Sequence, residues 1–321
     1  MSKGVAEANR MLQRNDVRGA AHILQHAEQS GDALAARELA LWLLAGQIVR
    51  RDLAASRAMF ERAAALGDPY SAGVTRAFVA GGVGGPADWQ RAIALLRDAA
   101  SSNGEAADQL RLIEAMALDQ DGGPAAAFAA DALSDAPEIR RFPALFSPAE
   151  CSYLIEVARP ILQPSVVVDP RTGQQVPNPV RTSSAAGFPF VDENPAIHAL
   201  NRRLAAASGT PVRAGEPLQI LHYAPGQQYH EHSDALPGVV PSQQRVLTFL
   251  VYLNEDYEGG ETTFPAAGVI FRGRIGDGLL FRNASADGRP DPRAIHAGLP
   301  VTRGVKHLAS RWIRAAPLIL E

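Results

Sequence analysis

The chain contains a single cysteine, Cys151, so a framework of disulfides within the chain is excluded. A structural zinc site built on several thiolates is excluded for the same reason. The sequence also lacks an excess of basic residues, because 34 Asp and Glu outnumber 31 Lys and Arg and give a net charge of −3. We therefore do not expect a nucleic-acid partner, although a local basic patch is compatible with this balance.

Long apolar runs are missing too, and no stretch is long enough to span a membrane as a helix. Residues Met1–Glu7 do not show a basic stretch followed by an apolar run, which is the pattern of a signal peptide. The lone cysteine fits a reducing compartment. We therefore predict a cytoplasmic protein without a membrane partner.

The composition that remains is that of a globular protein, with 46% hydrophobic and 20% charged residues over a length sufficient for two domains. Residues 1–118 are rich in Ala, Leu, Arg and Glu, and their apolar residues recur at the three- and four-residue spacing of helices. Turn residues bracket 119–137, which we interpret as a short helical linker. Residues 138–321 show a different pattern, which predicts a second domain.

The helical half contains an internal repeat. Three segments share a helical stretch that runs into a glycine and then an acidic residue: ILQHAEQSGD at 23–32, MFERAAALGD at 59–68 and LLRDAASSNGE at 95–105. In the first two, Gly31 and Gly67 are predicted to cap one helix before a second helix begins. The pattern resembles Sel1-like or tetratricopeptide repeats, whose helix pairs must stack to bury their apolar faces. The alternative is a plain alanine-rich helical bundle.

In the second half, Ser147–Glu150 forms a capping box with proline at the first helical position, which predicts a helix over Ala149–Val157. Many short strands with turns between them indicate an antiparallel double-sheet barrel, as in jelly rolls and cupins. We therefore predict an α+β protein, with an N-terminal α-helical repeat domain followed by a double-stranded β-helix domain with flanking helices. The strand-like runs are 165–168, 218–223, 246–253, 278–282 and 308–313.

Metal ligands are suggested by the stretch LHYAPGQQYHEHSD, in which His232 and Asp234 are two residues apart and share one strand face. With His296 they would supply the two histidines and one carboxylate that hold non-haem iron(II) and leave three coordination positions open. A His-x-Asp pair alone is a weak signal, since exposed polar residues often produce it. His230 shares the predicted strand face with His232 and is an alternative ligand.

Lys306 is predicted to lie inside the same barrel. In an alternating strand it shares one face with Leu308, Ser310 and Trp312. A lysine that points into an apolar interior requires an anion, and the distal carboxylate of an oxoacid would be one. The reversed register, with Lys306 exposed, is equally compatible with the alternation.

From Ala144 to Arg314 the sequence resembles the catalytic domain of prolyl 4-hydroxylases. The motifs that carry the resemblance occur in the family's order: Phe146–Ile155 (FSPAECSYLI), Val180–Ser184 (VRTSS), Tyr223–Asp234 (YAPGQQYHEHSD), Arg245–Asn254 (RVLTFLVYLN), Glu258–Pro265 (EGGETTFP), Gly276–Asn283 (GDGLLFRN), His296–Lys306 (HAGLPVTRGVK) and Arg311–Ile313 (RWI).

The resemblance implies an iron(II)- and 2-oxoglutarate-dependent dioxygenase that hydroxylates a C–H bond, with a prolyl residue of a peptide or protein as the expected target. It implies succinate and carbon dioxide as co-products, and ascorbate as a further cofactor. The implied site residues are the metal ligands His232, Asp234 and His296, the cosubstrate residues Lys306, Tyr223 and Thr263, and the substrate residues Arg245 and Arg181.

The chain departs from the family pattern in places that concern substrate choice. Arg282 stands where the family usually has tryptophan, which predicts a different pocket rim. The proline- and glycine-containing segment Val168–Val180 is interpreted as a mobile loop near the substrate groove, with a surface hairpin as the alternative. Tyr229 is expected near the site, but a packing role explains it equally well.

Three functions therefore stay open on the sequence. The first is a peptidyl-proline hydroxylase whose helical repeats dock the protein substrate. The second is the same chemistry on another residue or on a free small molecule. The third is a scaffold with a dead oxygenase, against which the intact set of His232, Asp234, His296 and Lys306 argues. The repeats are also compatible with a purely structural or dimerising role.

Overall fold

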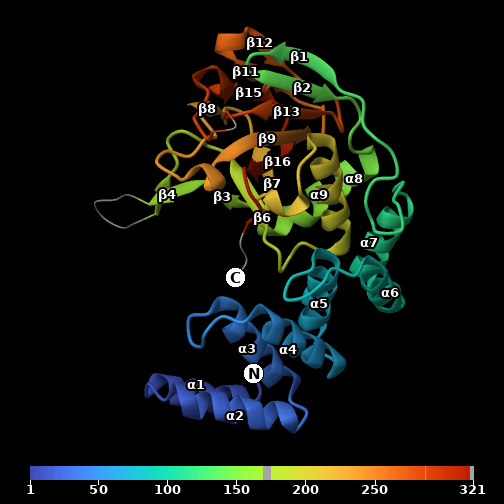
Figure 1. The fold of residues 1–321 in the computed structure, drawn as a ribbon, viewed down its shortest axis with the longest axis vertical. Coiled ribbons are helices and arrows are strands. Elements are labelled where there is room, and N and C mark those ends of the chain that lie inside the picture. Colours follow the sequence, from blue (N-terminus) through green and yellow to red (C-terminus); the bar gives the residue numbers. More distant parts are fainter. Residues whose placement is uncertain (169–174, 286, 319–321) are drawn as a thin grey trace. The chain divides into compact units, whose positions relative to one another are not determined.

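The computed structural model describes residues 1–168, 175–285 and 287–318 (Figure 1). Its internal contacts form two compact units. One contains Met1–Gly122 together with Phe190–Ala199, and the other contains Gly123–Pro189 and Leu200–Leu318. The first unit is helical and the second is built mainly of antiparallel strands, which confirms the predicted α+β class.

In the helical unit each helix packs against the next one along the chain (Figure 1). The helices begin where a Ser, Asp or Asn side chain accepts a hydrogen bond from a backbone amide of the first turn, as N-caps do. They are α1 (Lys3–Gln13), α2 (Val17–Gln29), α3 (Ala33–Ala45), α4 (Leu53–Ala65), α5 (Pro69–Gly81), α6 (Trp89–Ala100) and α7 (Gly104–Glu114).

The predicted helix pairs are confirmed, and the third segment of the repeat differs from the first two. Gly31 and Gly67 follow α2 and α4 with φ values of +90° and +92°, the left-handed conformation that a glycine cap requires. Gly104 has a different place, because it opens α7 and Asn103 is the cap. The recurring feature is therefore the N-cap of the second helix of each pair.

The helical unit buries a core of its own. Phe60 and Phe78 are fully buried and meet edge to face, with ring centroids 5.6 Å apart. Phe190, which follows the strand β6 (Ser184–Phe188), packs its ring 6.0 Å from that of Phe78. This core therefore includes a segment that comes after the first strands in the sequence.

The predicted helical linker is wrong. Within 119–137 the structure has the strand β1 (Asp131–Asp135), which pairs antiparallel with β2 (Glu138–Phe142). The alanine run of this segment favours a helix, but β2 also pairs with β13 (Gly278–Arg282) and draws the hairpin into a sheet. Tertiary pairing thus overrides the local preference.

The second unit contains a large sheet with the order β1-β2-β13-β9-β16-β7-β6-β3 and a smaller one with the order β12-β11-β14-β8, both antiparallel. Together they form the predicted double-stranded β-helix domain. The strands not yet given are β3 (Gln163–Pro164), β7 (Leu218–Tyr223), β8 (Tyr229–His232), β9 (Arg245–Tyr252), β11 (Thr262–Phe264), β12 (Val269–Phe271), β14 (His296–Gly298) and β16 (Lys306–Arg314). Two short ladders join β10 (Glu258–Gly259) to β15 (Val301–Arg303) and β4 (Val166–Val168) to β5 (Gln175–Pro177).

Two helices accompany the sheets. The predicted capping box is present, because Ser147 and Glu150 exchange hydrogen bonds at the start of α8 (Pro148–Ala158). The helix α9 (Pro195–Ser208) was not predicted. Its Arg203 forms a buried two-point ion pair with Glu150, at 2.6 and 2.8 Å.

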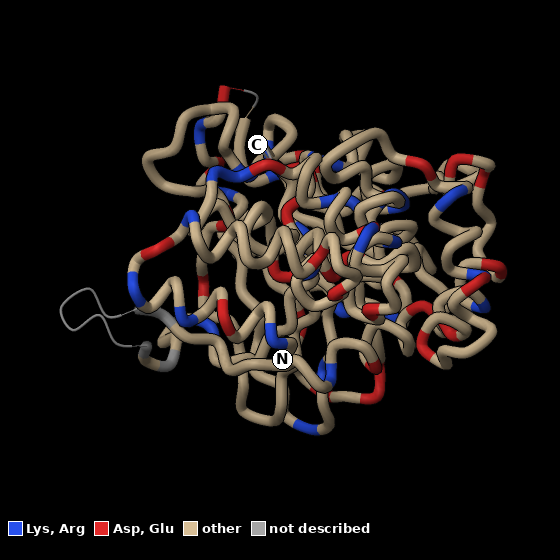
Figure 2. The backbone as a smooth tube through the Cα atoms, turned by 90° about the horizontal axis from the view of Figure 1, so that it is seen from below, with Lys and Arg blue, Asp and Glu red and all other residues tan. Residues whose placement is uncertain are grey.

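The segment Val168–Val180, interpreted as a loop, begins at the last residue of β4 and contains β5, which pairs with β4. The described part therefore matches the hairpin alternative, and residues 169–174 lie outside the described residues. Acidic and basic residues are interspersed along the chain in Figure 2. Among the described residues, no helix has both the length and the apolar character needed to cross a bilayer.

Candidate metal and cosubstrate site

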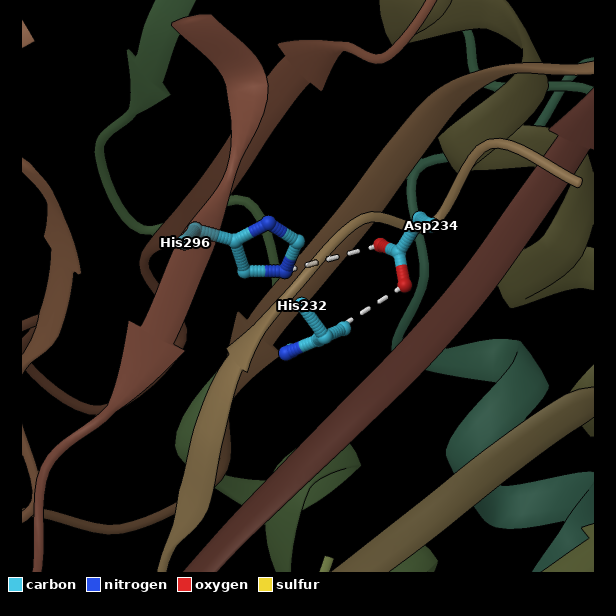
Figure 3. A group of neighbouring side chains, drawn as sticks. All are labelled: His232, Asp234 and His296. Carbon is cyan, nitrogen blue, oxygen red and sulfur yellow. Dashed lines mark ion pairs between the residues drawn. The ribbon is translucent and has the colours of Figure 1, made fainter. Parts of the chain in front are cut away.

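Three potential metal ligands converge at one end of the smaller sheet (Figure 3). His232 ends β8 and lies opposite His296, the first residue of β14, in the strand register. Asp234 follows β8 by two residues, and its carboxylate lies 3.5 Å from Nε2 of His232 and 3.6 Å from Nε2 of His296. One potential ligand atom from each of the three residues lies within 4.8 Å of the other two, which is close enough for all three to bind a single ion.

Backbone carbonyls determine which imidazole nitrogens are available. Nδ1 of His232 lies 2.8 Å from the carbonyl oxygen of His230, and Nδ1 of His296 lies 3.0 Å from that of Ala294. Because a carbonyl can only accept, each Nδ1 carries the proton, and each Nε2 presents its lone pair to the group. Two neutral imidazoles and a carboxylate are the donor set that suits non-haem iron(II).

Burial and charge favour the metal-binding protonation states. Burial lowers the pKa of His296 to about 4, so its imidazole is neutral at physiological pH. Burial alone would raise the pKa of Asp234, but the neighbouring His296 and His232 and a hydrogen bond from Thr248 outweigh it and hold that pKa well below its usual range. The carboxylate is therefore ionised.

A bulge in β8 removes the ambiguity over His230. The register shifts between the pairs His296–His232 and Gly298–Tyr229, so simple alternation fails within β8. The Tyr229 ring stacks on His232 with centroids 3.4 Å apart, whereas His230 is exposed and is not part of the ligand group.

The ligands open into a cavity that strands of both sheets line. The predicted face of β16 lines it, and the reversed register is excluded, because His307 lies on the opposite side against His222. The lining residues are Arg181, Leu221, Tyr223, Tyr229, His232, Asp234, Leu250, Thr262, His296, Gly298, Lys306, Leu308, Ser310 and Trp312.

Lys306 places its terminal amine in this cavity. Its Nζ donates to the carbonyl oxygen of Gly260 at 2.6 Å and lies 5.6 Å from the ring centre of Tyr223, its partner in the strand register. Burial lowers the pKa of Lys306 to about 7, and Glu261 acts in the opposite direction. An anionic group that binds beside Lys306 would raise this pKa again and keep the ammonium charged. The charged form is the one that the predicted oxoacid carboxylate would pair with.

Comparison with known proteins assigns this arrangement to a family. Residues 218–314 match the model of the 2OG-Fe(II) oxygenase superfamily. Prolyl 4-hydroxylase 1 of Arabidopsis thaliana is 39% identical over 201 residues, which is 57% of this chain and 71% of that protein. The chain belongs to the prolyl 4-hydroxylase family. It is a 2-oxoglutarate-dependent dioxygenase, and the cofactors of this superfamily are iron(II) and 2-oxoglutarate.

Solved structures similar to this prolyl 4-hydroxylase family member include two of different kinds. The viral collagen prolyl hydroxylase of Paramecium Bursaria Chlorella virus-1 is 27% identical and covers 57% of this chain and 99% of its own, with a TM-score of 0.46. A Sel1 repeat protein from Oxalobacter formigenes is 26% identical and covers 34% of this chain and 85% of its own, with a TM-score of 0.30.

One predicted cosubstrate residue of this family member needs correction. Thr262, and not Thr263, lines the cavity, and its hydroxyl lies 2.7 Å from that of Tyr252. Successive residues of a strand point to opposite faces, so choosing the second threonine of GGETTF selected the wrong side of β11. Tyr223 lines the cavity, as predicted.

The two arginines predicted to contact substrate occupy different places. Arg181 lines the cavity and donates to Ser165 at 3.0 Å. Arg245 stands behind the cavity, where its guanidinium lies 3.8 Å from the ring centre of Trp312 and pairs with both carboxylate oxygens of Glu216 at 2.7 and 2.8 Å. Of the two arginines, Arg181 is therefore the one that belongs to the cavity lining.

Arg282, which replaces the usual tryptophan of the family, does not belong to the cavity lining. It pairs with Glu138 at 3.0 Å. Its position at the end of β13, beside β2, directs it to the neighbouring strand.

Two buried residues at the site were missed by the sequence analysis. Thr248 donates its hydroxyl to Oδ2 of Asp234 at 2.7 Å, and Asn283 donates its amide to the Thr248 hydroxyl at 2.8 Å. Both lie within stretches that resemble family motifs, RVLTFLVYLN and GDGLLFRN. The sequence gives no sign that they meet, because 35 residues separate them.

Proposed function

We propose that this prolyl 4-hydroxylase family member hydroxylates a prolyl residue of a peptide or protein. The observation that carries the proposal is the single cavity that joins His232, Asp234 and His296 to Lys306. Bound iron(II), together with 2-oxoglutarate and dioxygen, supplies the oxidising chemistry that inserts oxygen into a C–H bond and releases succinate and carbon dioxide.

Each protein group then has a defined task. His232, Asp234 and His296 hold the metal through two neutral imidazoles and one carboxylate. Lys306 binds the distal carboxylate of 2-oxoglutarate, and Tyr223, opposite it in the strand register, contacts the same molecule. The leucine side chains of the cavity lining, Leu221, Leu250 and Leu308, exclude water around the cosubstrate.

Metal and cosubstrate binding are tested by an anaerobic titration with iron(II) and then 2-oxoglutarate, followed by the visible charge-transfer absorption of the chelated oxoacid. We expect the wild-type protein to develop this band and His232→Ala to lose it. Lys306→Ala should need far more oxoacid to reach the same absorption. His22→Ala and Lys3→Ala, at exposed positions, serve as matched controls and should behave as wild type.

The prolyl target is tested separately by succinate release and by mass spectrometry of proline-containing peptides after turnover. A mass gain of one oxygen on proline supports the proposal. Oxygen gained on another residue, or turnover confined to free small molecules, would replace the prolyl assignment and leave the oxygenase intact. A wild-type protein that binds neither iron nor oxoacid would refute the oxygenase itself.

The helical unit is proposed to dock the protein substrate. Its support is the buried core centred on Phe60 and Phe78, which gives the unit a fixed surface of stacked helix pairs. A panel of exposed substitutions along α2, α4 and α6 should raise the KM for a protein substrate and leave the KM for a short peptide unchanged. Equal KM values for all variants would favour a purely structural role.

Ascorbate use and a cytoplasmic location are proposed as well. Ascorbate should increase the number of turnovers before inactivation, which a time course with and without it measures. Cys151 is buried and free, in keeping with a reducing compartment. Fractionation of cells that produce the native protein would locate it directly.

A further inference from the structure

The two oxygens of the Asp234 carboxylate have different surroundings. Each oxygen faces one ligand imidazole, Oδ1 at 3.5 Å from Nε2 of His232 and Oδ2 at 3.6 Å from Nε2 of His296, but only Oδ2 also accepts the hydroxyl hydrogen bond of Thr248, at 2.7 Å. Thr248 comes from β9 of the larger sheet, whereas the ligand histidines belong to the smaller sheet. The carboxylate is thus held from the sheet that contributes no metal ligand.

The direction of the Thr248 hydroxyl is fixed by its second partner. Asn283 donates its amide nitrogen to the Thr248 oxygen at 2.8 Å, so the oxygen accepts on that side. The single hydroxyl proton then points to Asp234, whose ionised carboxylate can only accept. Thr248 and Asn283 are each 1% exposed, so water does not compete for these bonds.

The number of coordination positions on the metal indicates a role for the hydrogen bonds from Asn283 to Thr248 and from Thr248 to Asp234. An octahedral iron with three protein donor atoms keeps three positions for a chelating oxoacid and dioxygen. If Asp234 bound through both oxygens, one of those positions would be lost. An oxygen already engaged by a directed hydroxyl is the poorer metal ligand of the two, which leaves Oδ1 to the metal.

We propose that Thr248, aligned by Asn283, is a positioning residue that restricts Asp234 to one metal-bound oxygen, Oδ1. The hydrogen bond then preserves the coordination position that dioxygen needs once the oxoacid has bound. The inference rests on the proposed function, because it assumes that His232, Asp234 and His296 hold iron(II). Partners of this kind typically change metal affinity about 10- to 100-fold when they are removed.

The test uses the full-length chain and two readouts besides activity. Iron(II) affinity is measured by competition with a chelator. Nitric oxide, a surrogate for dioxygen, is then added to the anaerobic complex with 2-oxoglutarate, and its binding is followed by electron paramagnetic resonance. The variants are Thr248→Val, which removes the hydroxyl at nearly constant shape, and Thr248→Ser, which retains it. Thr75→Val, a buried threonine of the helical unit without a hydrogen-bond partner for its hydroxyl, is the matched control.

We expect Thr248→Val to change the iron(II) affinity about 10- to 100-fold, and to lose most nitric oxide binding when saturated with iron and oxoacid. Thr248→Ser should restore both, and Thr75→Val should match wild type. If Thr248→Val does not fold, as judged by thermal unfolding of the metal-free protein, Asn283→Ala carries the test, because it frees the hydroxyl to rotate and should show the same changes in weaker form.

A Thr248→Val protein that binds iron(II), oxoacid and nitric oxide as the wild type does would overturn the proposal. Failure of Thr248→Ser to restore binding would do the same, because it would show that shape and not the hydroxyl matters. A wild-type chain that binds no iron(II) refutes the proposed function instead, so the two failures are distinguishable.

Discussion

Lys306 is expected to make the affinity for 2-oxoglutarate depend on pH. Burial lowers the pKa of its ammonium group to about 7 in the free protein, with Glu261 acting in the opposite direction. The distal carboxylate of bound 2-oxoglutarate favours the charged form and raises this pKa. Above about pH 7, binding must therefore be accompanied by uptake of a proton, which weakens the apparent affinity.

The magnitude follows from the lowered pKa. With a pKa of about 7, roughly nine tenths of the lysine is charged at pH 6 and roughly one tenth at pH 8. The Kd for 2-oxoglutarate should therefore rise about 10-fold from pH 6 to pH 8, which corresponds to about 1.4 kcal/mol. Below pH 6 this contribution is flat, because the free lysine is already protonated.

Anaerobic calorimetry of the iron(II)-loaded protein, in buffers with different heats of ionisation, measures both the Kd and the protons taken up. Lys306→Arg stays charged over the whole range, so its Kd should not change with pH, whatever its absolute value. Lys3→Arg, at an exposed position, should follow the wild type. A wild-type Kd that is constant from pH 6 to pH 8, without proton uptake at pH 8, would refute the reasoning.

Three other predictions concern separate parts of the molecule. Thr262→Val should raise the Kd for 2-oxoglutarate several-fold in the same calorimetric assay, because Thr262 lines the cavity. An equal rise in Kd for Thr263→Val would contradict the assigned strand faces. Phe60→Ala should lower the free energy of unfolding of the helical unit by about 3–5 kcal/mol in urea, since Phe60 is fully buried; a loss below ~1 kcal/mol would contradict its place in the core. Burial lowers the pKa of His307 to about 4, so the unfolded state gains the proton first and stability should fall as the pH drops from about 6.5 to 4. His307→Gln should reduce this slope in urea titrations, and exposed His22→Gln should not.

Much of the fold could be predicted because its signals are local. The capping box at Ser147 and the glycines Gly31 and Gly67 determine helix ends through their own side chains or lack of one. The strand 218–223 was predicted with its observed bounds, since apolar runs between turns are visible in any window. The strand β1 was missed because its partner β2 is itself held by β13, more than a hundred residues along the chain.

The site residues likewise divide into those that sequence motifs reveal and those whose position depends on strand pairing. His232, Asp234, His296 and Lys306 could be chosen because residue types and the resemblance to prolyl 4-hydroxylase motifs agreed, and the structure brings all of them to one cavity. The bulge in β8 could not be predicted, because it depends on pairing with β14. The error at Thr263 has the same origin, since the register of β11 decides which threonine faces the cavity.

The location of the binding groups on different sheets has a consequence for the domain as a whole. The ligand histidines belong to the four-stranded layer, whereas Lys306 and Tyr223 belong to the eight-stranded layer. A molecule that chelates the metal at one end and meets Lys306 at the other therefore cross-links the two layers. Succinate lacks the keto group needed for chelation, so the product would connect the two layers less firmly than 2-oxoglutarate would.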